Sequence, residues 1–178
     1  MLTAPYIAII LAAGKGTRLE SDIPKVLHTI GNTTMIHRVI NSVNQAGIQE
    51  LCIVVGYKKD SVINACTPYT QHFATQEPQN GTGHAVQCAR HILTQSSQPH
   101  TIILAGDCPL IQPQTLVDLM NTHTKKNATA TILSATLPDA KSYGRIVRNA
   151  SDQVIGIQEA KDCTPEQLTI QEFNSGIY

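Results

Sequence analysis

A glycine-rich segment with three nearby cations is the part of this sequence best suited to chemistry. The segment Leu11–Leu19 reads LAAGKGTRL, and the segment Pro24–Leu27, PKVL, follows closely. Glycines let successive backbone N–H groups converge on an anion. Lys15, Arg18 and Lys25 add the positive charge that phosphate oxygens attract. After an apolar strand, such a loop predicts a nucleoside triphosphate site; an ordinary glycine turn between a strand and a helix is the alternative.

The spacing of this loop excludes two better-known phosphate loops. A dinucleotide fingerprint requires glycine or alanine three residues after Gly16, where this chain has Leu19. A P-loop requires four residues between its first glycine and Gly-Lys-Ser/Thr, and the segment Gly14–Thr17 offers no such frame. The loop therefore belongs to neither class.

A second polar segment, Gln76–His84, has the sequence QEPQNGTGH and precedes a helical pattern. The edge of a pyrimidine can present an acceptor, a donor and an acceptor in turn. A side-chain amide such as that of Gln76, together with backbone groups, matches that pattern. A surface turn capped by Thr82 is an equally good interpretation of these residues alone.

A third segment, Leu104–Leu110, reads LAGDCPL and places Asp107 at the end of an apolar strand. A carboxylate in that position can hold Mg²⁺, which prefers carboxylate and phosphate oxygens and keeps several waters. The alternative is an aspartate that caps the next turn. Asp107 is expected at the same sheet edge as the Gly14 loop, and this position favours the metal-binding interpretation.

A fourth group comprises Gly144, Glu159 and Asn174. The two polar side chains are able to hydrogen-bond sugar hydroxyls, and the glycine lets a ligand approach the backbone. On residue type alone, solvated loop residues are the simpler interpretation.

These segments need a scaffold, and the apolar pattern predicts one. Strands are expected at Tyr6–Ala12, Leu51–Val55, Thr101–Ala105, Ala128–Thr136 and Val154–Ile157. Helices are expected after a Thr34 cap, ending at Gly47, and at Gly83–Leu93 and Pro113–His123. This alternation predicts an α/β fold with a mostly parallel sheet and helices on both faces. Gly14, Gly56 and Asp107 then share the carboxyl edge of the sheet, where ligands bind in such folds. The β-rich part after Ala128 is expected to add strands rather than a second domain.

Composition excludes several classes of protein. The 178 residues include 13 basic and 13 acidic side chains, which gives no support to non-specific binding of nucleic acid or membranes. No apolar run approaches the roughly 20 residues that a membrane span needs. The first residues lack the features of a signal peptide, and the five scattered cysteines suit a reducing compartment, so a cytoplasmic protein is expected.

Taken in order, these segments resemble the uridyltransferase domain of the bifunctional GlmU-type N-acetylglucosamine-1-phosphate uridyltransferase/glucosamine-1-phosphate acetyltransferases. LAAGKGTR with PKVL is typical of sugar-nucleotide pyrophosphorylases in general. The segments GTGHA, YGRI and the final NSGI narrow the resemblance to the GlmU type, and it extends from about Ile7 to the last residue. It implies a Rossmann-like nucleotide-diphospho-sugar transferase fold of the GT-A-like kind.

The resemblance also implies roles for single residues. Leu11, Ala13 and Gly14 would line the nucleoside and phosphate loop, while Arg18 and Lys25 would face the phosphates as the catalytic cations. Other implied roles fall to the remaining segments: Gln76, Gly81 and Thr82 would bind uracil, Asp107 would bind Mg²⁺, and Gly144, Glu159 and Asn174 would hold N-acetylglucosamine. The implied substrates are UTP and N-acetylglucosamine 1-phosphate.

Two departures from the family pattern qualify these expectations. Ala105 stands where the family usually has tyrosine, which opens one wall of the sugar site. The family's uridyltransferase domain continues beyond the position of Tyr178 and supplies an asparagine as a second Mg²⁺ ligand. A C-terminally incomplete domain without the acetyltransferase β-helix is therefore expected over residues 1–178, as a monomer or weak homo-oligomer. The alternatives are another sugar-phosphate nucleotidyltransferase of this fold, or a domain that binds UTP or a UDP-sugar without turnover.

Overall fold

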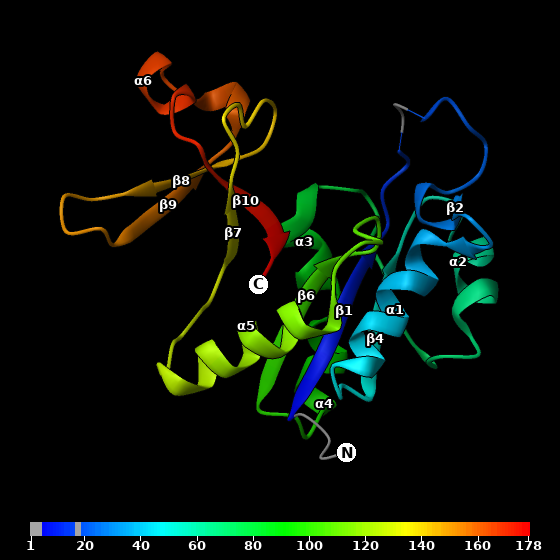
Figure 1. Ribbon diagram of the computed structural model, residues 1–178. Helices are drawn as coiled ribbons and strands as arrows, with labels where there is room; N and C mark the ends of the chain where they lie inside the picture. The colour runs from blue at the N-terminus through cyan, green and yellow to red at the C-terminus, as the bar shows by residue number, and fades with distance from the viewer. Residues whose placement is uncertain (1–4, 17–18) are drawn as a thin grey trace.

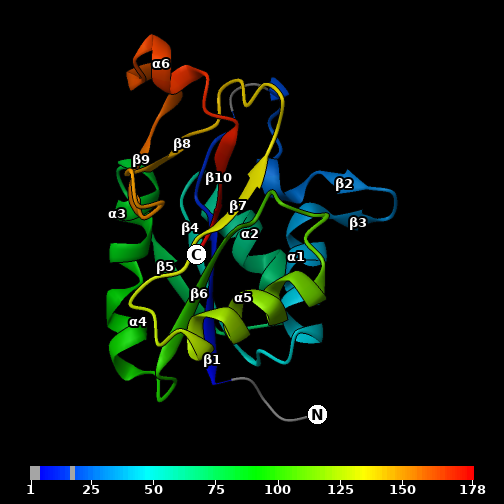
Figure 2. The same ribbon diagram turned by 60° about the vertical axis from the view of Figure 1, so that its left-hand side comes forward.

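A four-stranded parallel sheet lies at the centre of the chain. The computed structural model describes residues 5–16 and 19–178. The order of the strands is β5–β4–β1–β6, with helices on both faces (Figures 1 and 2). Their bounds are β1 (Tyr6–Ala12), β4 (Glu50–Val55), β5 (His72–Thr75) and β6 (His100–Ala105). The predicted α/β class and parallel sheet are confirmed.

Strand β1 is buried on both faces, which explains its continuous apolar sequence. Its alternate residues Ala8 and Ile10 pack in one core, and Ile7 and Ile9 pack in a second core on the other face. The first core contains the helices α1 (Met35–Gln45), α2 (Lys59–Cys66) and α5 (Pro113–Lys125). The second contains α3 (Gly81–Cys88) and α4 (Arg90–Gln95).

Helix α1 begins and ends where the sequence predicts. The hydroxyl oxygen of Thr34 accepts a hydrogen bond from the backbone N–H of His37, as an N-cap residue does. The chain leaves the helix through Gly47, whose φ of +90° is a conformation that favours glycine. One side of the helix is fully buried, and it consists of Ile36, Val39, Ile40 and Val43.

The single helix predicted over 83–93 is wrong, because two helices occupy this part of the chain. Helices α3 and α4 meet at Ala89, where φ is −82° and ψ is −1°. The backbone N–H of Ala89 bonds to the carbonyl of Val86, so the helix tightens to a three-residue turn at this point. Helix α2 and strand β5 were not predicted, while α5 matches its prediction within two residues.

The chain after α5 forms a second sheet, in the order β7–β10–β8–β9, with antiparallel pairs. Its strands are β7 (Leu133–Thr136), β8 (Arg145–Arg148), β9 (Val154–Gln158) and β10 (Glu172–Ile177). The predicted strand over 128–136 starts later, and β8 and β10 were not predicted. The shorter elements are β2 (Thr29–Ile30), β3 (Thr33–Thr34), α6 (Pro165–Leu168) and the 3-10 turns Lys25–Leu27 and Ala160–Asp162.

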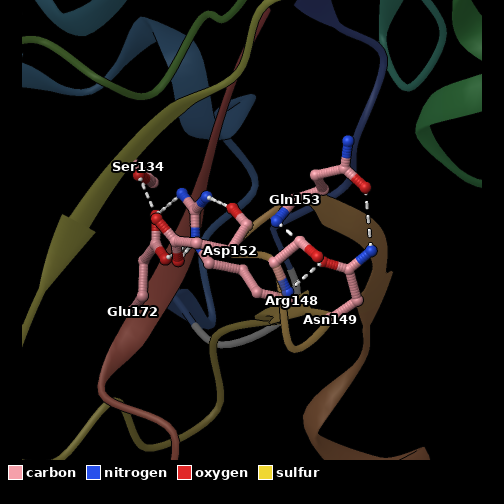
Figure 3. Close-up of polar contacts among 7 residues, drawn as sticks. Ser134, Arg148, Asn149, Asp152, Gln153 and Glu172 are labelled. Atoms are coloured by element: carbon pink, nitrogen blue, oxygen red, sulfur yellow. Dashed lines mark hydrogen bonds and ion pairs between the residues drawn. The ribbon is translucent and has the colours of Figure 1, made fainter.

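An ion pair at the centre of a polar network links three strands of the second sheet (Figure 3). Arg148 on β8 donates two hydrogen bonds, of 2.8 and 2.9 Å, to the carboxylate of Glu172 on β10. The Ser134 hydroxyl on β7 donates to the same carboxylate at 2.6 Å. The hydrogen bond from Arg148 lowers the pKa of Glu172. This network therefore favours the ionised carboxylate in the folded protein.

The two sheets are joined by the residue that follows β10. The backbone N–H and carbonyl of Tyr178 exchange hydrogen bonds of 3.1 and 2.9 Å with those of Ile103 on β6. The end of β10 therefore lies beside the edge of the parallel sheet, as both views show (Figures 1 and 2). Over residues 5–16 and 19–178, no helix has the length and apolar character needed to cross a membrane.

Candidate active site

The register of the parallel sheet brings four loops to one edge. Ala12 pairs with Val55, Leu11 pairs with Ala105, and Val55 also pairs with Thr75. The loops that follow β1, β4, β5 and β6 must therefore start side by side. Hydrogen bonds between them fix this edge: Tyr57 N–H donates to the Ala13 carbonyl, Gln76 N–H to Val55 and Gly106 N–H to Leu11, at 2.8–3.0 Å.

A cavity of about 370 Å³ opens at this carboxyl edge. Its walls include these residues predicted to contact the nucleotide or metal: Leu11, Ala13, Gly14, Lys25, Gln76, Gly81, Thr82 and Asp107. Lys15, the other predicted cation of the glycine loop that the structure describes, is not part of these walls, and its ammonium group lies 5.6 Å from the centre of the Tyr57 ring. The remaining walls are Ala12, Gly16, Val26, Gln79, Ala85 and Ala105. Arg18 lies outside the described residues, so its role stays a prediction.

A short 3-10 turn holds Lys25 over the cavity. Pro24 has the fixed φ that starts such a turn, and its carbonyl accepts a hydrogen bond of 2.8 Å from the Leu27 N–H. Val26 is buried in the first core and anchors the turn. A Cβ on Gly106 would lie 3.1 Å from Val26 Cγ1, so the glycine leaves room for this anchor at the end of β6. The sequence PKVL thus combines a turn, a charge and an anchor.

The glycine loop approaches Lys25 closely. Gly16 has a φ of +66°, in the left-handed region. A Cβ at Gly16 would lie 2.6 Å from the Cβ of Lys25. Both the backbone conformation and the contact therefore require glycine at this position, whereas a Cβ on Gly14 would meet no atom within 4 Å.

Lys25 and Asp107 form an ion pair across the mouth of the cavity. The side chains are 41% and 29% exposed, so both charges remain accessible to a ligand. The N-cap residue of α5 is Gln112, so Asp107 does not cap that helix. Burial, and secondarily the negative charge of Asp107, raise the pKa of the neighbouring Cys108 thiol. The pair places one basic and one acidic group at the same point of the sheet edge.

The donor set around Asp107 suits Mg²⁺ better than a metal that needs an all-protein cage. Within the ranges that the structure describes, no group of three or more His, Cys, Asp or Glu side chains could hold a metal ion. Mg²⁺ is commonly bound through one or two carboxylates, with substrate phosphates and waters completing its shell. A single accessible carboxylate beside the glycine loop fits that pattern.

Gln76 is the buried polar side chain of the cavity. It is only 4% exposed, and its Nε2 donates a hydrogen bond of 2.9 Å to the carbonyl of Gly81. Helix α3 has Asn80 as its N-cap residue and no side-chain cap hydrogen bond. Thr82 lines the cavity, and residues 77–83 are exposed. The segment is therefore at the surface, as the alternative interpretation expects, but the cap that this interpretation assigns to Thr82 is not formed.

The residues predicted to hold the sugar lie together on the second sheet, outside the walls of the cavity. Asn174 N–H donates a 2.8 Å hydrogen bond to the Gly144 carbonyl, and a Cβ on Gly144 would lie 3.5 Å from Glu159 Oε1. The Asn174 side chain is engaged within the protein, because its Nδ2 donates to the Tyr178 hydroxyl at 2.7 Å. The structure thus groups these three residues but separates them from the cavity lining.

Buried Arg145 shapes the loop before this group. Its guanidinium donates hydrogen bonds to the carbonyls of Ala140, Lys141 and Tyr143. It is 2% exposed. The loop therefore wraps around the guanidinium, and this fixes the position of Gly144 directly before β8.

Several lining residues were not among those predicted. Val26 and Ala85 are apolar wall residues, and Gln79 belongs to the polar segment but was given no role. The signal for Ala85 was available, because it lies one helical turn after Gly81 and faces the second core. Ala105 also lines the cavity, so the position where the family usually carries tyrosine is part of its wall.

The chain is similar in sequence to known proteins. A bifunctional protein GlmU from Syntrophomonas wolfei is 43% identical over 171 residues, which are 96% of this chain and 38% of the relative. A GlmU from Lactococcus lactis is 44% identical over 96% of this chain and 37% of its own length. The chain thus spans well under half of these relatives, and its predicted resemblance to GlmU-type sequences is confirmed.

The fold has solved counterparts. A UDP-glucose pyrophosphorylase complexed with UDP-glucose superimposes with a TM-score of 0.74 at 18% identity, covering 99% of this chain and 75% of the other. The model of the MobA-like NTP transferase domain matches residues 8–148, which contain the glycine loop, Lys25, Gln76 and Asp107. The chain therefore belongs to the family of MobA-like NTP transferase domains.

Proposed function

We propose that the chain is a uridyltransferase that transfers UMP from UTP to N-acetylglucosamine 1-phosphate and releases pyrophosphate, giving UDP-N-acetylglucosamine. The observation that carries the proposal is one cavity lined by the glycine loop, the Lys25–Asp107 pair and the Gln76 amide. The identity of more than 40% with GlmU proteins over nearly the whole chain supports the choice of substrates.

The reaction needs no general base. The attacking oxygen belongs to a sugar 1-phosphate, which is already anionic near neutral pH. The barrier is the repulsion between this anion and the triphosphate, so catalysis consists of positioning and charge stabilisation. In this chain Lys25 would provide the charge from the wall of the cavity, and Arg18 would add to it.

The ion pair with Asp107 also determines when the charge of Lys25 is available to a substrate. In the protein alone, Asp107 balances its charge. A bound phosphate group competes for the ammonium group, so Lys25 is available to the substrate while its stem stays fixed by the 3-10 turn. When bound at Asp107, Mg²⁺ would supply charge neutralisation at the phosphates.

The sugar would lie toward the second sheet, where Gly144, Glu159 and Asn174 gather. Glu159 is the freest hydrogen-bonding group of the three, because Asn174 Nδ2 and Oδ1 already bond to Tyr178 and to the Gly176 N–H. Ala105 contributes only a methyl group to the cavity wall. This small wall favours a second candidate, transfer to a different sugar 1-phosphate by the same chemistry.

The test is release of pyrophosphate from UTP and N-acetylglucosamine 1-phosphate, with Mg²⁺ and then with EDTA. Glucose 1-phosphate in place of the N-acetylated sugar separates the two candidates. Lys25→Ala is the informative variant, and Lys125→Ala, which removes an exposed charge near the end of α5, is the matched control. Metal-dependent release that is lost in Lys25→Ala and kept in Lys125→Ala would support the proposal. Tight binding of UTP without release under any of these conditions would contradict it.

A further inference from the structure

Both N–H groups of the buried Gln76 amide are used inside the protein. Its Nε2 lies 2.9 Å from the carbonyl oxygen of Gly81 and 3.3 Å from Nδ1 of His84. A carbonyl oxygen can only accept a hydrogen bond, so the amide atom that faces Gly81 must be the nitrogen. The orientation of the amide is therefore determined by its surroundings.

The contact with Gln76 determines where the proton of His84 lies. Because the second N–H of Gln76 is directed at Nδ1, this ring nitrogen has to accept, and the imidazole carries its proton on Nε2. Nε2 lies 3.8 Å from Sγ of Cys88, one turn further along α3. Sulfur is a weak acceptor, so the pair is compatible with an Nε2–H donor.

These contacts occupy the nitrogen of the Gln76 amide and leave its oxygen, Oε1, free to accept a hydrogen bond. Among the residues that the structure describes, no group donates to Oε1 of Gln76, and the side chain lines the cavity. Oε1 therefore offers an acceptor to a ligand. Uracil and thymine carry a hydrogen on N3, at the centre of their base-pairing edge, whereas N3 of cytosine is itself an acceptor. An acceptor facing an acceptor leaves a buried polar group unpaired, which is costly.

We propose that His84 is a positioning residue for base selection: it holds the Gln76 amide so that the cavity accepts a pyrimidine with N3–H and rejects cytosine. This inference rests on the proposed function for the class of ligand. Gly81 alone would hold the amide by one hydrogen bond, and His84 adds the second. If the amide were flipped, its oxygen would face two acceptors, the Gly81 carbonyl and Nδ1 of His84, whereas without His84 it would face only the carbonyl.

The test is the dissociation constant of UTP and of CTP, measured by isothermal titration calorimetry, which needs no turnover. His84→Phe keeps a ring but removes the acceptor, so we expect the preference for UTP over CTP to fall about tenfold, as the loss of one hydrogen bond implies. His84→Asn places an amide oxygen close to the position of Nδ1 and should restore most of the preference. His91→Phe, the same change at an exposed histidine of α4, is the matched control and should leave both constants unchanged.

Each outcome bears on the inference. An unchanged ratio in folded His84→Phe, or an equal weakening of UTP and CTP, would overturn it, because a merely structural role predicts equal losses. Wild-type protein that binds the two nucleotides equally, or binds neither, would also overturn it. A chain that prefers UTP but releases no pyrophosphate would contradict the proposed function and leave the role of His84 supported. Release of pyrophosphate at equal efficiency from UTP and CTP would support the transfer reaction of the proposed function and contradict the role of His84 in base selection.

Discussion

Replacing Gly16 with alanine tests the packing between the glycine loop and Lys25. Gly16 has a φ of +66°, and its substituted Cβ would lie 2.6 Å from Cβ, 3.2 Å from Cγ and 3.3 Å from Cδ of Lys25. The clash at Cβ cannot be relieved by a rotamer change, because Cβ is fixed to the backbone. Either the loop or the turn that carries Lys25 has to move.

The expected cost follows from two contributions. A left-handed conformation costs alanine about 1–2 kcal/mol. Overpacking against a constrained neighbour costs roughly 1–3 kcal/mol. The lower entropy of the unfolded alanine chain offsets about 0.4–1 kcal/mol of this. We therefore expect Gly16→Ala to destabilise the protein by about 3 kcal/mol, which lowers Tm by roughly 6–12 °C in a chain of this length.

Thermal unfolding followed by circular dichroism measures the stability, and pyrophosphate release well below Tm measures the activity. Gly156→Ala on β9 is the matched control, because its Cβ would meet no atom within 4 Å and its φ is not positive. It should stay within about 0.5 kcal/mol of wild type. The folded Gly16→Ala variant should also lose at least tenfold in turnover through the displacement of Lys25. A Tm within about 2 °C of wild type would refute the packing argument.

Three further predictions address charge and burial. Lys25→Ala should lower kcat at least about 100-fold and change Tm little, since exposed ion pairs contribute at most about 1 kcal/mol; a folded variant with near-wild-type turnover would rule out its role. Glu172→Gln should cost stability at neutral pH, because the hydrogen bond from Arg148 lowers the pKa of Glu172 in the folded state. The difference from wild type should begin to shrink as the pH falls below the ordinary carboxyl pKa of 4.5 and should vanish once the pH is below the lowered pKa of the folded state. Thermal unfolding at several pH values measures this, and a difference that does not shrink at all as the pH falls below 4.5 would contradict it. Cys52 and Cys66, whose pKa values burial raises to about 12, should react with a thiol-specific disulfide reagent only on unfolding, and rapid labelling of either in the native protein would contradict their burial.

The central sheet and the cavity at its carboxyl edge were predictable because short-range patterns determine both. The apolar run of β1 requires two covered faces, and the loops after parallel strands start at the same edge. Glycine, lysine and aspartate at those strand ends then indicate an anion site without any knowledge of packing. Gly14, Lys25 and Asp107 line one cavity for this reason.

The rest depends on contacts between distant parts of the chain. The sequence does not show that Gly16 packs on Lys25, or that the Gln76 amide meets His84, because these contacts arise from loop conformations. The strands of the second sheet are short and half exposed, so their alternation is weak. The pairing of β10 with β7 and β8, which are distant in the sequence, therefore had no local signal, whereas β8 pairs with the neighbouring β9 and was missed because it is short.

Strand β10 serves two sheets, and this limits how the halves of the molecule can move. It pairs with β7 and β8, while Tyr178 pairs with Ile103 on β6. The second sheet therefore cannot swing away as a rigid body without breaking the backbone hydrogen bonds between Tyr178 and Ile103. Gly176, with a φ of +78°, lies where the register of β10 with β7 shifts, between Asn174 and Ile177. A glycine at this point thus lets one strand leave its pairing with the second sheet and continue to the edge of the parallel sheet.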